Sequence, residues 1–269
     1  MIDRRHFCLA AAAGVAATAA GDPPDDGAAK RSDDLPSPPL PKDDERAVRR
    51  KSLEALGEAG FRVAGNLPLW SEWTGEPLRL RPAEEIAGRL MSFFATTLYL
   101  QAESLPESDL TGWLDSAGLR AGLTEKERDA FSMDRGAAVE KYANLDGWRQ
   151  ENLWAAAWVL GFDRRPGLRD GFIDGRVVGE MRKSALPKTG TGISDYLKEH
   201  RPRPLAEVAS LHDLFYCAHN AVRSAQQGRD TVPEGFDPTR DGGVVHEKRH
   251  ALTWCLSPGV AWDATDLAT

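Results

Sequence analysis

The residues best suited to chemistry lie in the run His246-Glu247-Lys248-Arg249-His250. Two histidines four residues apart project to the same side of a helix, where both can bind a zinc ion. A glutamate next to the first histidine can act as a general base on a zinc-bound water molecule. One interpretation of this run is therefore a zinc-dependent hydrolase of the HExxH metallopeptidase type.

Three features of the surrounding sequence argue against the zinc interpretation. Lys248 and Arg249 stand between the glutamate and the second histidine, and two cations would repel a divalent metal ion. No His or Glu follows His250, so Asp263 would be the most plausible third ligand. On a helical wheel, both histidines lie opposite the apolar residues, which predicts that they face solvent or a shallow surface. We therefore favour a chance match and expect no cofactor, with zinc as the alternative.

The same helical wheel places Glu247 and Lys248 inside or beside the apolar arc. Buried charges need partners. Arg149 and Glu151 on a central helix, and Asp213 on another, can supply them, which predicts an ionic network that joins three helices. The alternative is that these charges reach the surface along their long side chains. In such a network, perturbed carboxylates at Glu151 and Glu247 would be candidates for acid and base catalysis without a metal.

Most of the chain after residue 45 has helical patterns. Asp43 and Asp44 can cap a first helix that ends near Gly57. Capping residues, prolines and apolar spacing bound further helices at about 82–98, 124–131, 146–160, 204–226 and 244–256. Short strands are predicted at 61–63 and 173–178. We therefore predict a mainly α fold, with about six or more helices and few or no short strands in a single compact domain over residues 46–269.

The first 45 residues have a different composition. Residues 1–20 are predicted to be a signal peptide, in which Arg4-Arg5 followed by Phe7 resembles the twin-arginine export signal; an ordinary secretory leader is the alternative. Residues 21–45 are rich in proline and acidic side chains, which predicts a disordered linker. We expect an exported protein, periplasmic or extracellular. In an oxidising compartment Cys217 and Cys255 would either form a disulfide or remain free thiols.

The charge of the chain argues against two classes of partner. The formal net charge is −7, and the acidic excess is concentrated in the first 45 residues. The mildly negative remainder lacks the basic character that binding to nucleic acid or to an anionic membrane requires. We expect no nucleic-acid partner and no integral membrane span after signal removal. An unknown protein or a small molecule remains the expected partner.

Several motifs together carry a family resemblance. They are Trp148-Arg149-x-Glu151, then Leu211 to Tyr216, then Glu247 to Trp254. In this order and spacing, over about residues 46–266, they resemble the family catalogued as domain of unknown function 4272. The chain departs from the family pattern at Cys217 and Asn220, where Arg and Trp are usual. The resemblance implies a fold and no activity, so we expect an exported helical protein of unknown biochemical role, more a binding or interaction module than an enzyme.

Overall fold

The computed structural model describes residues 38–269, apart from the side chains of residues 143–147. The predicted signal peptide and most of the predicted linker lie outside the described residues. The first helix, α1 (Lys42–Glu58), begins before the expected domain boundary at residue 46. Residues 42–45 are therefore helical, and the Glu45 side chain is buried and accepts hydrogen bonds from Ser71.

The described residues form helices and no strand, so the predicted mainly α fold is confirmed. Two of the elements, η2 and η3, are 3-10 helices. The elements after α1 are α2 (Trp70–Thr74), α3 (Ala83–Gln101), α4 (Glu107–Ser116), η2 (Leu119–Gly122), α5 (Glu125–Ser132), α6 (Arg135–Val159), α7 (Gly175–Ser184), α8 (Ile193–Glu199), α9 (Leu205–Gln226), α10 (Arg240–Cys255) and η3 (Trp262–Ala264).

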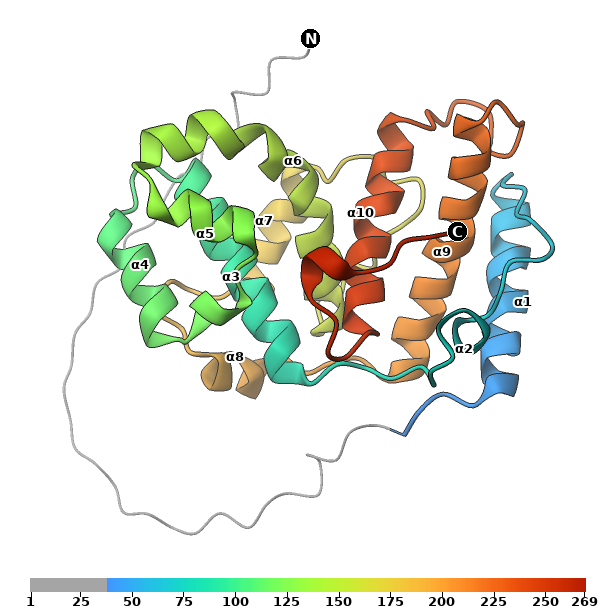
Figure 1. Ribbon diagram of the computed structural model, residues 1–269, viewed down its shortest axis with the longest axis horizontal. Coiled ribbons are helices and arrows are strands. Elements are labelled where there is room, and N and C mark those ends of the chain that lie inside the picture. Colours follow the sequence, from blue (N-terminus) through green and yellow to red (C-terminus); the bar gives the residue numbers. More distant parts are fainter. Residues whose placement is uncertain (1–37) are drawn as a thin grey trace.

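The long helices follow one another across the molecule in the order α3, α6, α10, α9 and α1 (Figure 1). Helices α4, α5 and α8 lie at the α3 end, and α2 lies at the α1 end. Helix α10 therefore packs against α6 on one side and α9 on the other. This central position explains why α10 buries charged residues that a surface helix would expose to water.

Two consecutive glycines allow α10 to approach both neighbours closely. A Cβ atom on Gly242 would lie 2.5 Å from Cγ1 of Val222 on α9. A Cβ atom on Gly243 would lie 2.2 Å from Cζ3 of Trp148 on α6. Both distances are shorter than any real carbon contact, so only glycine fits this backbone approach.

Several sequence predictions differ from the structure. Residues 61–63 form a loop and not the predicted strand, and Asp43 and Asp44 lie inside the first turn of α1, which starts after Pro41. Helix α6 begins at Arg135, where Asp134 caps it by accepting hydrogen bonds from Gly136 N and Ala137 N, and not at residue 146. Its first half lacks an apolar stripe, which hid it from a search for periodicity. The strand predicted at 173–178 is wrong, because Asp174 accepts a hydrogen bond from Val177 N and begins α7. A capping aspartate outweighs the β preference of two valines.

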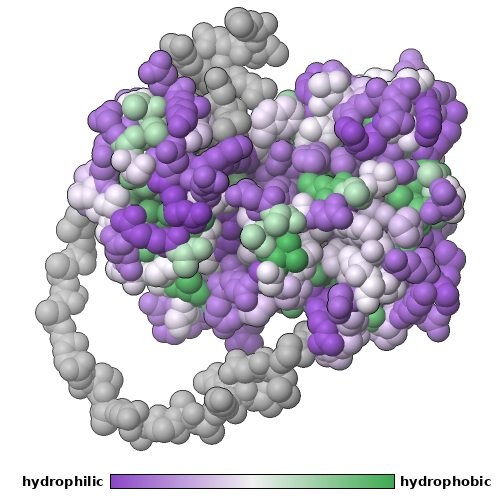
Figure 2. Space-filling view, in the orientation of Figure 1, coloured by the Kyte–Doolittle hydropathy of each residue, from purple (hydrophilic) through white to green (hydrophobic). Residues whose placement is uncertain are grey.

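The visible face of the molecule is mostly hydrophilic, with apolar residues in separate small patches (Figure 2). Among the described residues, Leu53 is the one large hydrophobic side chain classed as exposed. In the same part of the chain, no helix has both the length and the apolar character that crossing a membrane requires.

Candidate ligand-binding site

The charged run on α10 lies largely inside the molecule. Lys248 and Arg249 are fully buried, whereas His246, Glu247 and His250 are half-buried. Of the two environments predicted for the histidines, free solvent does not apply to His246 or His250, and their half-buried positions fit a shallow surface. The helical wheel assumed one apolar face, but α10 packs on two sides and has two buried faces.

The Lys248 side chain points toward α6, where it pairs with Glu151. Nζ of Lys248 lies 3.5 Å from Oε2 of Glu151, and neither side chain has exposed area. Lys248 also donates to the carbonyl oxygen of Gly167, and the Ile173 N–H donates to Oε1 of Glu151 at 2.6 Å. Burial raises the pKa of Glu151 and lowers that of Lys248, while their mutual attraction opposes both shifts. The predicted link between these two helices is present.

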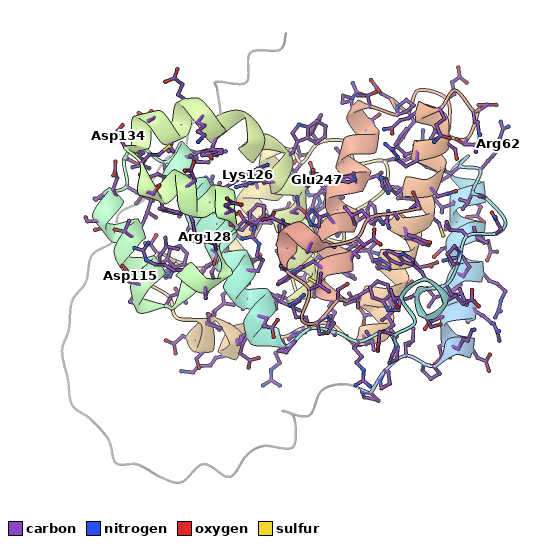
Figure 3. All side chains as sticks on the ribbon, viewed as in Figure 1. Arg62, Asp115, Lys126, Arg128, Asp134 and Glu247 are labelled. Carbon is purple, nitrogen blue, oxygen red and sulfur yellow. The ribbon has the colours of Figure 1, made fainter. Side chains whose placement is uncertain are left out.

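Glu247 also faces α6 (Figure 3). Its Oε2 atom accepts a hydrogen bond from Nδ2 of Asn152 at 2.5 Å. Burial raises the pKa of Glu247, and the positive charge of Arg149 opposes the rise. Arg149 itself contacts Glu127 at 3.4 Å, and Arg89 pairs with the same carboxylate at 2.7 Å. The predicted network thus extends to α3 and α5 through residues that the sequence did not indicate.

Asp213 is not a member of this network, which corrects the prediction. Its carboxylate pairs with the guanidinium of Arg49 on α1, with Nη2 and Oδ1 at 2.9 Å. Arg49 also donates to the carbonyl oxygens of Leu67 and Pro68. Asp213 joins α9 to α1 because it lies on the side of α9 that faces away from α6. The periodicity of one helix does not show which neighbour covers each face.

Arg249 differs from the other buried cations. In the described part of the chain, five Lys or Arg residues are buried, and four have a carboxylate within 4.0 Å. Arg249 has no such partner there. The four pairs are Arg49 with Asp213, Arg81 with Glu85, Arg89 with Glu127, and Lys248 with Glu151. A buried guanidinium without a carboxylate is costly, so its other contacts carry information about function.

The guanidinium of Arg249 is held by uncharged groups. Nη1 donates to Nδ1 of His219 and, at 2.8 Å, to the carbonyl oxygen of Leu267. Nη2 donates to the carbonyl oxygen of Ala268 at 2.9 Å. Its Nε atom is buried and has no hydrogen-bond partner. The guanidinium lies 4.9 Å from the ring centre of Tyr216, in cation–π range.

Burial lowers the pKa of Arg249 to about 10. The nearby carboxylate that opposes this shift belongs to Asp266, an exposed residue that is not paired with Arg249. Asp266 and both carbonyl groups belong to the extended segment after η3. This segment crosses α10 toward α9 (Figure 1). A surface segment therefore covers a buried cation.

The histidines of the zinc interpretation have other partners. Nδ1 of His246 lies 3.4 Å from Nε2 of His219. Nε2 of His250 lies 3.0 Å from the carbonyl oxygen of Trp262, and the two rings are in contact. Asp263, the expected third ligand, is exposed on η3. The described residues contain no group of three or more His, Cys, Asp or Glu side chains suited to hold a metal ion.

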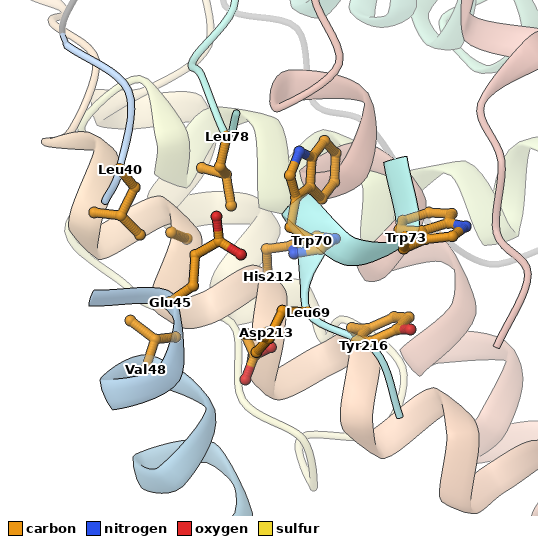
Figure 4. Close-up of a pocket in the computed structure, with 11 residues that line it drawn as sticks. Leu40, Glu45, Val48, Leu69, Trp70, Trp73, Leu78, His212, Asp213 and Tyr216 are labelled. Carbon is orange, nitrogen blue, oxygen red and sulfur yellow. The ribbon is translucent and has the colours of Figure 1, made fainter. Parts of the chain in front are cut away.

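A small cavity lies beside Tyr216 and Trp73, two aromatic rings near the Arg249 guanidinium (Figure 4). Its walls include Trp70, Trp73 and Tyr216, of which the last two rings are stacked with centres 5.8 Å apart. The cavity volume is about 20 Å³, enough for one water molecule. Nε1 of Trp70 is buried without a partner. The cavity is therefore suited to an ordered water and not to a substrate.

Comparison with known proteins identifies a family. The family model for the domain of unknown function DUF4272 matches residues 48–265. The chain belongs to this family. No curated protein and no solved structure matches the chain. The family description assigns no function, so the function of this DUF4272 domain has to be inferred from its own residues.

Sequence reasoning named Arg249 in the DUF4272 domain only as a cation that would repel zinc. The spacing of Arg249 from Val245 and Leu252, by four and three residues, could have shown that it shares a helix face with two fully buried residues. Cys217 and Cys255 are both buried free thiols in this structure. Of the two predicted alternatives, the structure therefore has the free thiols and not the disulfide.

Proposed function

We propose that this DUF4272 protein is a binding module, and that its ligand pairs with the guanidinium of Arg249 on the face formed by α9 and α10. One observation carries the proposal. Among the described residues, Arg249 is the buried cation that lacks a carboxylate partner, and exposed backbone covers it. A charged ligand would give a stronger partner than a carbonyl group.

The candidate acid and base residues support binding over catalysis. Glu151 is paired with Lys248, and Asp213 with Arg49, so both carboxylates are occupied within the fold. Oε2 of Glu247 is occupied by Asn152. These contacts tie α6 to α10 and α1 to α9. Such pairs fix the arrangement of helices and hold Arg249 in place.

The binding proposal is tested with the full chain and a panel of simple anions: sodium acetate, phosphate and sulfate. Thermal unfolding would show an anion-dependent rise in melting temperature, since a ligand that binds the folded state stabilises it. Arg249→Met should abolish the rise. Arg62→Met is the matched control, because Arg62 is exposed and paired with Asp230. An equal rise in both variants would contradict the proposal.

We also propose that the protein is exported to the periplasm or the extracellular space. The proposal is supported by the Arg4-Arg5 pair and the Ala-rich run that follows it. The test changes both arginines to lysine and follows the protein by cell fractionation. Retention inside the cell would support twin-arginine export, and unchanged export would contradict it.

A further inference from the structure

The segment over Arg249 makes few hydrogen bonds to the rest of the fold. In the described part of the chain, the hydrogen bonds that join residues 266–269 to the rest of the fold are the two donated by Arg249. A further bond, from the Ala268 N–H to Asp266, lies within the segment. Asp266, Ala268 and Thr269 are exposed, and Leu267 is half-buried. Displacing this segment would break these two hydrogen bonds, expose the half-buried Leu267 and move the Asp266 charge away from Arg249.

The two carbonyl oxygens occupy the positions that a carboxylate would take. Nη1 and Nη2 of Arg249 each donate to a different oxygen, at 2.8 and 2.9 Å, as in a two-point contact with a planar anion. Two successive backbone carbonyls imitate that geometry without its charge. A carboxylate would keep both hydrogen bonds and neutralise the buried cation.

The surroundings of Arg249 favour a single negative charge over the two of a phosphate. The guanidinium of Arg49 also lies over the Tyr216 ring, but Asp213 already neutralises its charge. His219 accepts a hydrogen bond from Arg249 and remains neutral in that contact. The ring of Trp73 lies 5.9 Å from the Arg249 guanidinium, so the site also has an apolar wall. Among the described residues, Arg249 is the one buried cation here without a carboxylate, and its place beside aromatic rings suits a monocarboxylate.

We infer that Arg249 is the anchor of a carboxylate-binding site, and that residues 266–269 occupy this site in the absence of ligand. The inference rests on the proposed function and narrows it to one ligand class. The carboxylate comes either from a free small acid or from the end or an acidic side chain of a polypeptide. In both cases its two oxygens replace the carbonyl oxygens of Leu267 and Ala268.

The test compares the full chain with a variant that lacks residues 266–269. Both are titrated with sodium acetate while the fluorescence of the tryptophans, which include Trp73 near Arg249, is recorded. We expect the shortened variant to bind acetate at least about tenfold more tightly, because no internal segment competes. Acetamide, which has the same shape and no charge, should not bind. Adding Arg249→Met to the shortened variant should abolish acetate binding.

Two further arms separate the sources of the carboxylate. A tripeptide of alanine is compared with its C-terminal amide, and with an amidated tripeptide whose central residue is aspartate. Tighter binding of the free tripeptide than of acetate supports a chain terminus, whereas tighter binding of the aspartate peptide supports an acidic side chain. Acetate binding at least as tight as both supports a small free acid. Each of these results supports the inference that the ligand of Arg249 is a carboxylate.

Three outcomes would overturn the inference, and the first two differ in what they say about the proposed function. If the shortened variant is folded and binds inorganic phosphate through Arg249 but not acetate, the ligand class is wrong and the binding module stands. If the folded variant binds none of these anions, both are wrong. If the shortened variant does not fold, the full chain is titrated with acetate while the amide resonances of Ala268 and Thr269 are followed by NMR. Unchanged resonances at saturating acetate would then overturn the inference.

Discussion

Arg249 donates a hydrogen bond to Nδ1 of His219, and this contact fixes the proton of a neighbouring ring. A guanidinium has donors only, so Nδ1 of His219 must be the acceptor and the proton of the neutral imidazole lies on Nε2. Nε2 of His219 faces Nδ1 of His246 at 3.4 Å. His219 is therefore the donor to His246, whose own proton lies on Nε2. A directed chain of hydrogen bonds runs from α10 to α9 and back.

The hydrogen bonds from Arg249 to His219 and from His219 to His246 predict the tautomers of both histidines. In NMR spectra of the full protein near neutral pH, the ring nitrogens of His219 and His246 should both show the proton on Nε2. Arg249→Met should release His219 to exchange between tautomers, because Nδ1 loses its donor. Arg62→Met should leave both rings unchanged, since Arg62 is exposed in the loop after α1 and pairs with Asp230. A proton on Nδ1 of His219 in the unaltered protein would contradict the assignment.

The buried histidines make stability depend on pH. Burial, aided by the charge of Arg249, lowers the pKa of His212 and of His219 to about 3. In the unfolded chain the pKa is about 6.5. Below that pH the unfolded state binds more protons, so the free energy of unfolding falls as the pH falls. These two residues together give a slope of roughly 2.7 kcal/mol per pH unit well below pH 6.5.

Urea unfolding between about pH 7 and about pH 5.5 follows the rise toward this slope before most carboxylates titrate. The raised pKa values of Glu151 and Glu247 act in the opposite direction, because the folded state gains protons there as the pH falls. The lowered pKa values of His246 and His250 add to the slope in the same direction. His219→Gln keeps an acceptor for Arg249 and should remove the contribution of one histidine, up to roughly 1.4 kcal/mol per pH unit. A free energy of unfolding that is constant over this range would show that the histidines are not buried as described.

The helical architecture could be predicted from the sequence, and the neighbours of each helix could not. The predicted start of a helix near residue 124 and the predicted end of another near residue 160 were correct, because the capping box of Thr124 and Glu127 and the positive φ of Gly161 are local signals. The pairing of Asp213 with Arg49 depends on which helix covers α9, and periodicity does not contain that information. The covering of Arg249 by backbone carbonyls leaves no side-chain pattern at all.

Because α10 and α6 approach each other closely at Gly243, one added methyl group there should lower the stability of the protein strongly. Gly243→Ala would place Cβ 2.2 Å from the Trp148 ring, so we expect the protein to lose roughly 1–3 kcal/mol or more of stability. Gly112→Ala is the matched control, since Gly112 lies inside α4 and a Cβ there meets nothing within 4 Å. That change should stabilise the protein by up to about 1 kcal/mol. Urea unfolding measures both, and equal effects would contradict the described packing.

The buried pair of Glu151 and Lys248 predicts strong coupling between two substitutions. Glu151→Gln alone leaves a buried cation and should cost roughly 3–5 kcal/mol, as should Lys248→Met alone. The double variant leaves no unpaired charge, so it should be more stable than the sum of the single effects implies. A double-mutant cycle by urea unfolding measures the difference. Additive effects would mean that the two charges do not depend on each other.

The hydrogen bonds of His246 and His250 also predict how the protein responds to zinc. To bind a metal, His246 would have to give up its contact with His219 or use Nε2, which carries its proton. His250 offers Nδ1, because its Nε2–H donates to the Trp262 carbonyl group. We expect equimolar zinc chloride to leave the melting temperature of the full chain unchanged, with the same result for a His246→Ala, His250→Ala double variant. If the unaltered chain bound one zinc ion and the double variant bound none, this conclusion would be reversed. His246, Glu247 and His250 would then form a metal site that exists only when the His219 contact breaks.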